Sequence, residues 1–147
     1  MPDRSKRLLE AAGMLLILAL TAVVLYVLLL YPGDISAQQT ENRKIFGATY
    51  MTMNNPYYHV LDSQLRAEIE ARGDVLLTRD AAMDQMRQNQ EVRDLIEEGA
   101  QAIFLTPVEW DTVREGLEAA NRAGVPVIVV DAPVQDAELV ACSVLSD

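Results

Sequence analysis

Cysteine and histidine are nearly absent from this chain of 147 residues, which contains one of each, Cys142 and His59. A single thiol cannot form an intrachain disulfide bond, and one Cys with one His cannot complete the ligand set of a zinc site. Nucleotide-binding and catalytic signatures are also missing, since no G-x-x-x-x-G-K-[ST], G-x-G-x-x-G or G-x-S-x-G sequence occurs. We therefore predict no metal and no cofactor, and ligand binding without catalysis.

Basic residues are scarce relative to acidic ones. The chain has 12 Lys and Arg against 22 Asp and Glu, which gives a formal net charge of −10. A surface with this charge repels phosphate backbones, and no segment resembles a basic recognition helix. Nucleic acid is therefore not expected as a partner.

Charged residues are missing from one continuous stretch, residues 11–33, most of which is aliphatic. At about 1.5 Å rise per residue, some 20 apolar residues in a helix cross a hydrocarbon core of about 30 Å. Arg4, Lys6 and Arg7 precede the stretch, so the positive-inside rule places residues 1–10 in the cytoplasm. The sequence predicts an N-terminal transmembrane anchor at 11–33, a single-pass membrane protein, and a domain on the extracytoplasmic face.

A cleaved signal peptide is the alternative for this stretch, and it would leave the protein secreted or periplasmic. Signal peptides usually have an apolar region of about 7 to 15 residues, and this one is longer. The nearest cleavage-like sequence, Ile35-Ser36-Ala37, places isoleucine where a small side chain is preferred. The following residues, 34–43, are polar and are predicted to be a tether.

Short apolar runs alternate with amphipathic segments through residues 44–147. This alternation is typical of an α/β domain with a doubly wound parallel sheet, because each crossover helix returns the chain to the same end of the next strand. Four runs have strand length, and a fifth strand is predicted at 139–144; each amphipathic segment ends at a glycine, as helices often do. The four strands are predicted at 45–49, 75–78, 102–105 and 127–130, and the glycines are Gly73, Gly99 and Gly124.

Polar and aromatic residues directly follow the first and fourth predicted strands. Asn55, Tyr57 and Tyr58 follow the first, and Asp131 follows the fourth. Parallel strands end at one edge of the sheet, where ligands of open α/β folds bind. A carboxylate and an amide suit sugar hydroxyls, and tyrosine rings can stack on the C–H face of a sugar ring. The sequence predicts a sugar site made by these four residues.

Structural roles are the alternatives for the same residues. Asn55 precedes Pro56 and can simply cap a helix while the tyrosines pack, and Asp131 in Asp-Ala-Pro can simply shape a turn. Three further residues are expected to have structural roles. Asp80 is expected in a solvated turn, Trp110 in packing, and Cys142 as a small buried hydrophobe in the fifth strand.

Several segments together resemble the first lobe of the type I sugar-binding proteins of ABC importers, the ribose and galactose binder group. The similar segments, which extend over residues 44–147, are KIFGA at 44–48, NNPYY at 54–58, DLI at 94–96, AIFLTP at 102–107, AANRAGVPVI at 119–128, and Asp131. The resemblance implies ligand-binding roles for Asn55, Tyr57, Tyr58 and Asp131. Two positions depart from ribose-type members: Ala132 replaces a frequent sugar-contacting arginine, and Met51 replaces a small polar residue.

The resemblance further implies a bilobal clamshell of about twice this length, so we expect these residues to be an incomplete lobe that binds sugar weakly or not at all. It implies a sugar as ligand and ABC permease subunits as partners. The alternative function is a membrane-tethered sensor that presents sugar binding to a signalling partner. A hydrophobic segment where a DNA-binding helix pair would precede the domain disfavours a repressor.

Overall fold

The computed structural model describes residues 4–30 and 43–146. The chain divides into two compact units, 1–42 and 43–147. Within the first unit, α1 is a helix over Arg4–Leu30. A search of the described residues finds no helix with the length and apolarity needed to cross a bilayer, so the predicted transmembrane anchor is not supported. Almost all of the predicted tether, 34–43, lies outside the described residues.

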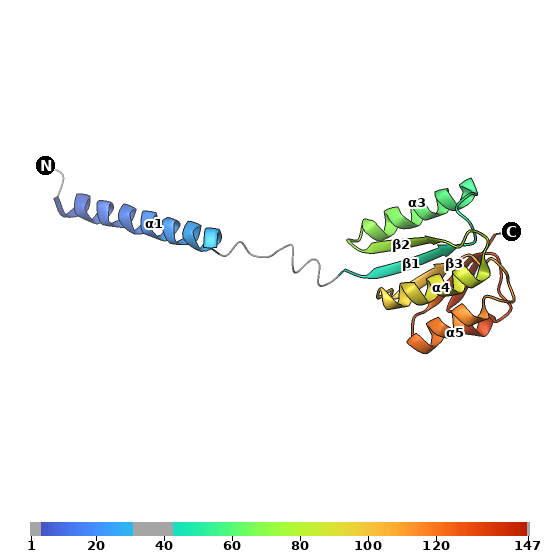
Figure 1. Ribbon diagram of the computed structural model, residues 1–147. Helices are drawn as coiled ribbons and strands as arrows, with labels where there is room; N and C mark the ends of the chain where they lie inside the picture. The colour runs from blue at the N-terminus through green and yellow to red at the C-terminus, as the bar shows by residue number, and fades with distance from the viewer. Residues whose placement is uncertain (1–3, 31–42, 147) are drawn as a thin grey trace. The chain divides into compact units, whose positions relative to one another are not determined.

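The second unit is built on one parallel sheet of five strands in the order β2-β1-β3-β4-β5. Its elements alternate as the sequence predicts (Figure 1). The strands are β1 Ile45–Tyr50, β2 Val75–Asp80, β3 Ala102–Leu105, β4 Val127–Asp131 and β5 Cys142–Leu145. The helices are α3 Pro56–Glu70, α4 Gln85–Glu97 and α5 Arg114–Ala123, with a short 3-10 turn η1 at Ala137–Leu139. The prediction of an α/β domain with a parallel sheet is confirmed.

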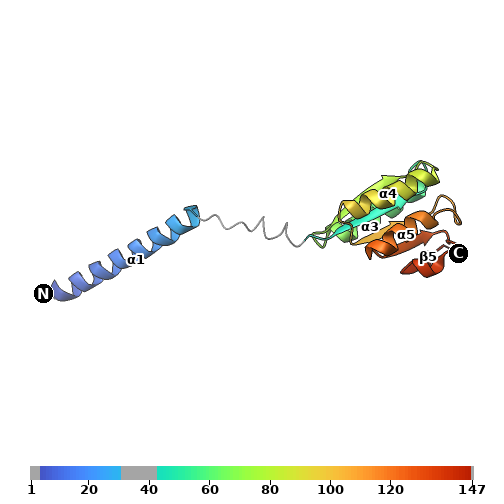
Figure 2. The same cartoon turned by 60° about the horizontal axis from the view of Figure 1, so that its bottom comes forward.

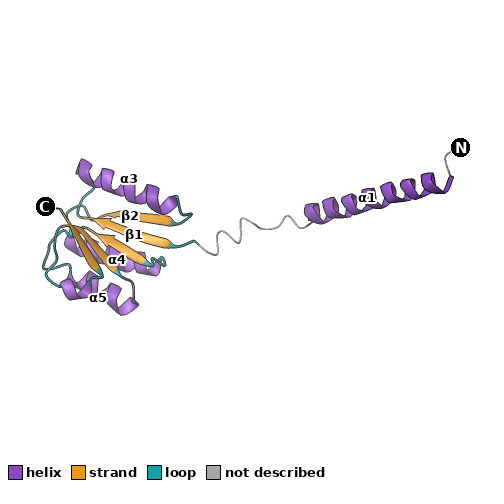
Figure 3. Ribbon diagram, turned by 180° about the vertical axis from the view of Figure 1, so that it is seen from behind, coloured by secondary structure: helices purple, strands orange, loops and turns teal. Residues whose placement is uncertain are grey.

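Helices cover both faces of the sheet. Helix α3 lies on one face, and α4 and α5 lie on the other, which Figure 1 and the view from behind in Figure 3 both show. Figure 2 shows α4 and α5 side by side on their face. The larger core cluster joins α4 and α5 to β3 and β4, and a smaller one joins α3 to β1. The doubly wound arrangement is therefore present, but among residues 43–146 α3 is the one helix on its face.

Local chemistry explains most helix ends. The Asn55 side chain accepts a hydrogen bond from the amide of Tyr57, and the Asp84 side chain accepts one from the amide of Arg87, so both residues cap helices. Gly124 ends α5 with φ +70°, a left-handed conformation that glycine adopts without a Cβ clash. The start of α5 is different: the helix begins at Arg114, and Val113 occupies its cap position without a side-chain hydrogen bond.

The fifth strand differs most from its prediction. It begins at Cys142 instead of residue 139, because η1 occupies Ala137–Leu139. All four residues of β5 are exposed, since β5 is the edge strand and pairs with β4 alone within the described residues. The prediction of a buried Cys142 is wrong: its thiol is free and exposed.

Candidate ligand site at the carboxyl edge of the sheet

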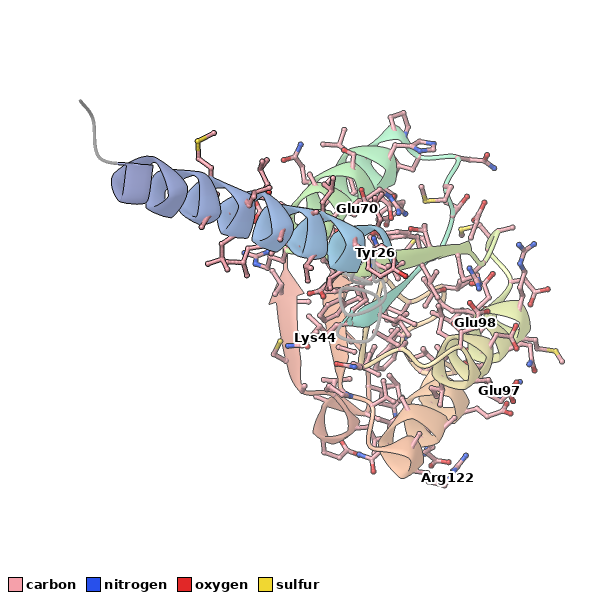
Figure 4. All side chains as sticks on the ribbon, turned by 90° about the vertical axis from the view of Figure 1, so that its left-hand side faces the viewer. Tyr26, Lys44, Glu70, Glu97, Glu98 and Arg122 are labelled. Carbon is pink, nitrogen blue, oxygen red and sulfur yellow. The ribbon has the colours of Figure 1, made fainter. Side chains whose placement is uncertain are left out.

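The predicted site residues lie at the edge where the parallel strands end. Asn55 caps the helix that follows β1, and Asp131 is the last residue of β4. Figure 4 views the domain from the side of the opposite edge, where Lys44 precedes β1 and where Glu70 and Arg122 lie near the ends of their helices. The fold thus brings two segments far apart in sequence to one edge of the sheet.

Tyr58 and Asp131 are in direct contact. The Tyr58 hydroxyl donates a hydrogen bond to Oδ2 of Asp131 over 3.0 Å, across 73 positions of sequence. Tyr58 is only 3% exposed, and its ring stacks on Tyr50 with centroids 5.8 Å apart. Its neighbour Tyr57 meets it edge-on at 5.2 Å and is 47% exposed. The two tyrosines therefore differ: Tyr58 is a buried anchor for the carboxylate, whereas Tyr57 presents a free ring surface.

Asp131 has an unusual backbone conformation. Its φ is +74°, a left-handed value that is uncommon for a residue with a side chain. Its other carboxylate oxygen, Oδ1, accepts a hydrogen bond from the hydroxyl of Ser146 at 2.7 Å. Such conformations cost of order 1–3 kcal/mol and persist where surrounding contacts hold them, often at functional sites. Asp131 is thus more than the end of a turn, because two hydroxyl groups from other elements hold its half-buried carboxylate.

The pKa of Tyr58 is raised from 10.0 to about 12, first by burial and then by the hydrogen bond to Asp131 and the negative charge of that carboxylate. The protonated phenol is the form that donates to the carboxylate. The same interactions therefore keep Tyr58 neutral as a donor throughout the physiological pH range.

Asn55 has the structural role that the sequence left open. Its Oδ1 accepts the hydrogen bond from Tyr57 N at 3.0 Å, and Tyr58 N bonds its backbone carbonyl at 3.1 Å. The cap uses the carbonyl half of the amide, so the Nδ2 donor is the half that a ligand can use. Asn55 is exposed, which is compatible with both roles.

Asp80 shapes the turn after β2, as expected, but it is half-buried instead of fully solvated, and it also braces the loop between β1 and α3. Its Oδ1 accepts hydrogen bonds from Met53 N at 3.0 Å and Ala82 N at 2.9 Å. Met83 N also donates to the carbonyl of Met51 at 2.7 Å, and both Ala82 and Met83 have positive φ. The loops after β1 and β2 are therefore tied together beside the candidate site.

A buried polar network also stabilises the same edge of the sheet. Glu91, 6% exposed, accepts a hydrogen bond from Thr49 Oγ1 at 2.8 Å and from Arg87 Nε at 3.0 Å. Gln88 is fully buried; its Nε2 donates to the carbonyl of Thr106, and its Oε1 accepts from Val108 N. The sequence does not predict this network. Gln88 and Glu91 are polar residues of a helix, and their spacing alone does not show that their side chains face the core.

A hollow lies at this edge between three loops, and we call it the Trp110 hollow. It has a volume of about 530 Å³. It is lined by Met51, Pro107, Val108, Glu109, Trp110, Asp111, Ala132 and Pro133. The prediction that Trp110 packs into the domain is wrong, because it is 57% exposed. Among residues 4–30 and 43–146, no group of three or more His, Cys, Asp and Glu side chains is placed to hold a metal ion.

Comparison with known proteins places this geometry in a family. The family model for the periplasmic binding protein domain matches residues 46–147 of this chain. The ribose import binding protein of Bacillus subtilis is 34% identical over 92 residues, which are 61% of this chain and 30% of that protein. The ribose import binding protein of Haemophilus influenzae is 27% identical over 113 residues, which are 77% of this chain and 37% of that protein. The chain thus spans about a third of the length of these relatives.

Solved structures agree with the sequence relatives. An ABC transporter solute-binding protein from Mycobacterium smegmatis, with bound glycerol, superimposes with a TM-score of 0.62 at 36% identity. That match covers 65% of this chain and 33% of the other. The arabinose-binding protein of Shewanella sp. ANA-3 gives 0.62 at 28% identity, over 71% of this chain and 35% of the other. With its parallel sheet and the match over residues 46–147, the chain belongs to the type I periplasmic sugar-binding proteins.

Proposed function

We propose that this chain is a lobe of an extracytoplasmic sugar-binding protein that delivers its ligand to an ABC importer. The observation that carries the proposal is the Tyr58–Asp131 hydrogen bond at the carboxyl edge of the sheet, with Asp131 at φ +74°. Asp131 has a strained backbone, and the buried phenol of Tyr58 holds its carboxylate in position before any ligand arrives. Preorganisation of this kind lowers the cost of binding.

The chemistry of the four residues fits a polyhydroxylated ligand. A carboxylate accepts hydrogen bonds from two hydroxyls at once, and bonds to charged groups contribute about 1.5–3 kcal/mol each. We assign that role to Asp131, with sugar hydroxyls displacing the Ser146 hydroxyl from Oδ1. The exposed ring of Tyr57 provides an apolar surface for a sugar ring, and the Nδ2 of Asn55 provides a donor. Tyr58 acts by positioning Asp131 from a buried site.

The importer role is supported by the relatives, which are ribose import binding proteins and an ABC transporter solute-binding protein. Because this chain spans about a third of their length, we propose that the remaining ligand contacts come from a second lobe. A micromolar site requires about 8 kcal/mol, and half of that energy corresponds to about millimolar affinity. We therefore expect weak binding by these residues alone.

Ligand-observed NMR tests this proposal, because saturation transfer detects millimolar complexes. We expect saturation transfer to at least one sugar in a panel of pentoses and hexoses, and we expect Asp131→Ala to abolish it. Asn55→Asp is the matched variant for the cap: the carboxylate still accepts from Tyr57 N, so the helix start is kept while the amide donor is lost. Transfer to no sugar, or transfer that Asp131→Ala leaves unchanged, would contradict the proposal.

The sensor alternative shares the binding step and differs in the partner. Co-purification with permease subunits supports import, whereas co-purification with a membrane kinase supports sensing. Export is supported by the basic residues before the uncharged stretch 11–33. The N-terminal residue of the mature protein decides how that stretch is used: a start near Gln38 means that it is removed, and a start at Met1 means that it is retained.

A further inference from the structure

Trp110 is held in an exposed position by the backbone around it. Val108 N donates to Gln88 Oε1 and Glu109 N donates to Gln85 Oε1, both over 2.9 Å. The carbonyl of Trp110 itself accepts a hydrogen bond from Gln135 N at 2.8 Å. Side chains of α4 and the loop after β4 thus fix the segment on both sides. An indole that is 57% exposed on a braced loop is a rigid apolar surface, because little further ordering is needed when a ligand covers it.

The same hollow contains both positions that depart from the ribose-type pattern. Met51 and Ala132 line it together with Trp110 and Pro133. With Pro107 and Val108, six of the eight residues that line the hollow are apolar. A methyl group at position 132 also occupies far less space than a long polar side chain. The volume of about 530 Å³ falls within the range of small-molecule sites, which is about 300–1,000 Å³.

The charges at the hollow have one sign. Glu109 and Asp111 are both exposed and both line it. Oδ1 and Oδ2 of Asp131, one residue before Ala132, already carry the negative charge of the candidate site. An anionic group entering the hollow would meet the carboxylates of Glu109 and Asp111, so a neutral group is favoured.

We propose that the Trp110 hollow is a subsite for an uncharged, apolar exocyclic group of a sugar whose hydroxyls are bound by Asp131. Ala132, which directly follows Asp131, lines the hollow, so we place a sugar held by the carboxylate beside the hollow with its exocyclic carbon toward the indole. The subsite selects 6-deoxy sugars and hexoses over pentoses and uronic acids. This inference rests on the proposed sugar-binding function and adds the class of sugar.

Three sugars that differ at a single carbon test the subsite. D-Fucose, D-galactose and D-galacturonate carry a methyl, a hydroxymethyl and a carboxylate group at C6. We expect D-fucose to bind about three- to fivefold more tightly than D-galactose, as expected for burial of about one methyl-sized apolar group, and D-galacturonate to bind much more weakly. Trp110 is the one tryptophan of the chain, so its fluorescence reports occupancy of the hollow directly. D-Fucose is expected to shift the emission to shorter wavelength.

Variants separate this inference from the proposed function. Trp110→Ala should weaken D-fucose binding roughly tenfold and abolish the D-fucose preference, while Trp110→Phe keeps part of it. Met86→Ala is the matched control, since Met86 is 82% exposed and does not line the hollow; it should change nothing. If the sugars bind through Asp131 but bind equally well and leave the emission unchanged, the subsite is overturned and the proposed function stands. If no sugar of the wider panel of pentoses and hexoses binds, both are overturned.

Discussion

The two faces of the sheet are closed to different degrees. On the face covered by α4 and α5, Ile103, Leu105, Val127 and Val129 are at most 1% exposed. On the other face α3 packs against β1 and β2, and an apolar groove of about 190 Å³ remains beside it. Ile128, Val130 and Val144 line that groove, and Val144 is 59% exposed. One face is thus a closed core, whereas the other keeps apolar surface in contact with water.

Because of this difference, the face that contributes most to stability is not the face that carries Tyr58 of the candidate site. The closed face fixes the strands, including β4, which ends at Asp131. Tyr58 belongs to α3 on the less closed face, and its hydroxyl joins that helix to β4. We therefore expect α4 and α5 to protect their amides from hydrogen exchange more strongly than α3 does, because protection follows local burial.

The largest loss of stability is expected for a substitution in the closed core. Leu95 of α4 is fully buried and packs against Gly47 so closely that a Cβ there would lie 2.8 Å from its Cδ1. Leu95→Ala should lower the free energy of unfolding by about 2–5 kcal/mol, through lost burial and the cavity left behind. Val144→Ala is the matched change on the open face, and it should cost less than about 0.5 kcal/mol because the side chain is already exposed. Urea denaturation followed by circular dichroism measures both; similar losses would contradict the comparison.

An intermediate effect is expected at the buried carboxylate that connects α4 to the end of β1. Glu91→Ala removes the acceptor for Thr49 Oγ1 and for Arg87 Nε. The Thr49 hydroxyl is then buried without this partner, which should cost about 1–3 kcal/mol. Glu91→Gln, which keeps an acceptor oxygen, should cost less. A denaturation midpoint lower for the glutamine than for the alanine variant would contradict this, because glutamine keeps both the side-chain volume and the acceptor that alanine lacks.

The sequence predicts the fold because its signals are local. Apolar runs, capping residues and terminal glycines act within a few positions, and the structure places β1, β3 and β4 within one or two residues of the predicted ends. Cys142 and Trp110 were misplaced for a different reason. Their burial depends on which elements lie across from them. Strand β5 is an edge strand with exposed residues, and the backbone amides of the Trp110 loop donate hydrogen bonds to side chains of α4.

The candidate site is only partly predictable for the same reason. Convergence of Tyr58 and Asp131 follows from parallel strand order, which the alternation of elements implies. The different burial of Tyr57 and Tyr58 does not follow. NNPYY contains two adjacent tyrosines, and no local rule says which of them faces the sheet. The helix phase set by Asn55 and Pro56 determines it, and only the structure gives that phase. The left-handed φ of Asp131 was likewise invisible in Asp-Ala-Pro.

The smallest effect is expected for the bond that joins α3 to β4. Tyr58→Phe removes the hydroxyl that Asp131 accepts from and should cost about 0.5–1.5 kcal/mol, the net contribution of one hydrogen bond. Since the pKa of Tyr58 is raised from 10.0 to about 12, its contribution to stability is complete below pH 10 and is lost as pH rises from 10 to about 12. The stabilities of the wild type and of the Tyr58→Phe variant should therefore converge in that range.

Tyrosinate absorbance near 295 nm gives an independent reading of the same group. Tyr58→Phe should remove an ionisation step at about pH 12, whereas Tyr57→Phe should leave that step in place. Hydrogen exchange measures whether the same hydroxyl also affects the stability of the helices on the two faces. If the hydroxyl is what holds α3 against β4, Tyr58→Phe speeds exchange in α3 and leaves α4 and α5 unchanged, because their contacts lie on the closed face. Faster exchange in all three helices would mean instead that the faces unfold as one unit, and that the open groove does not weaken its side of the domain.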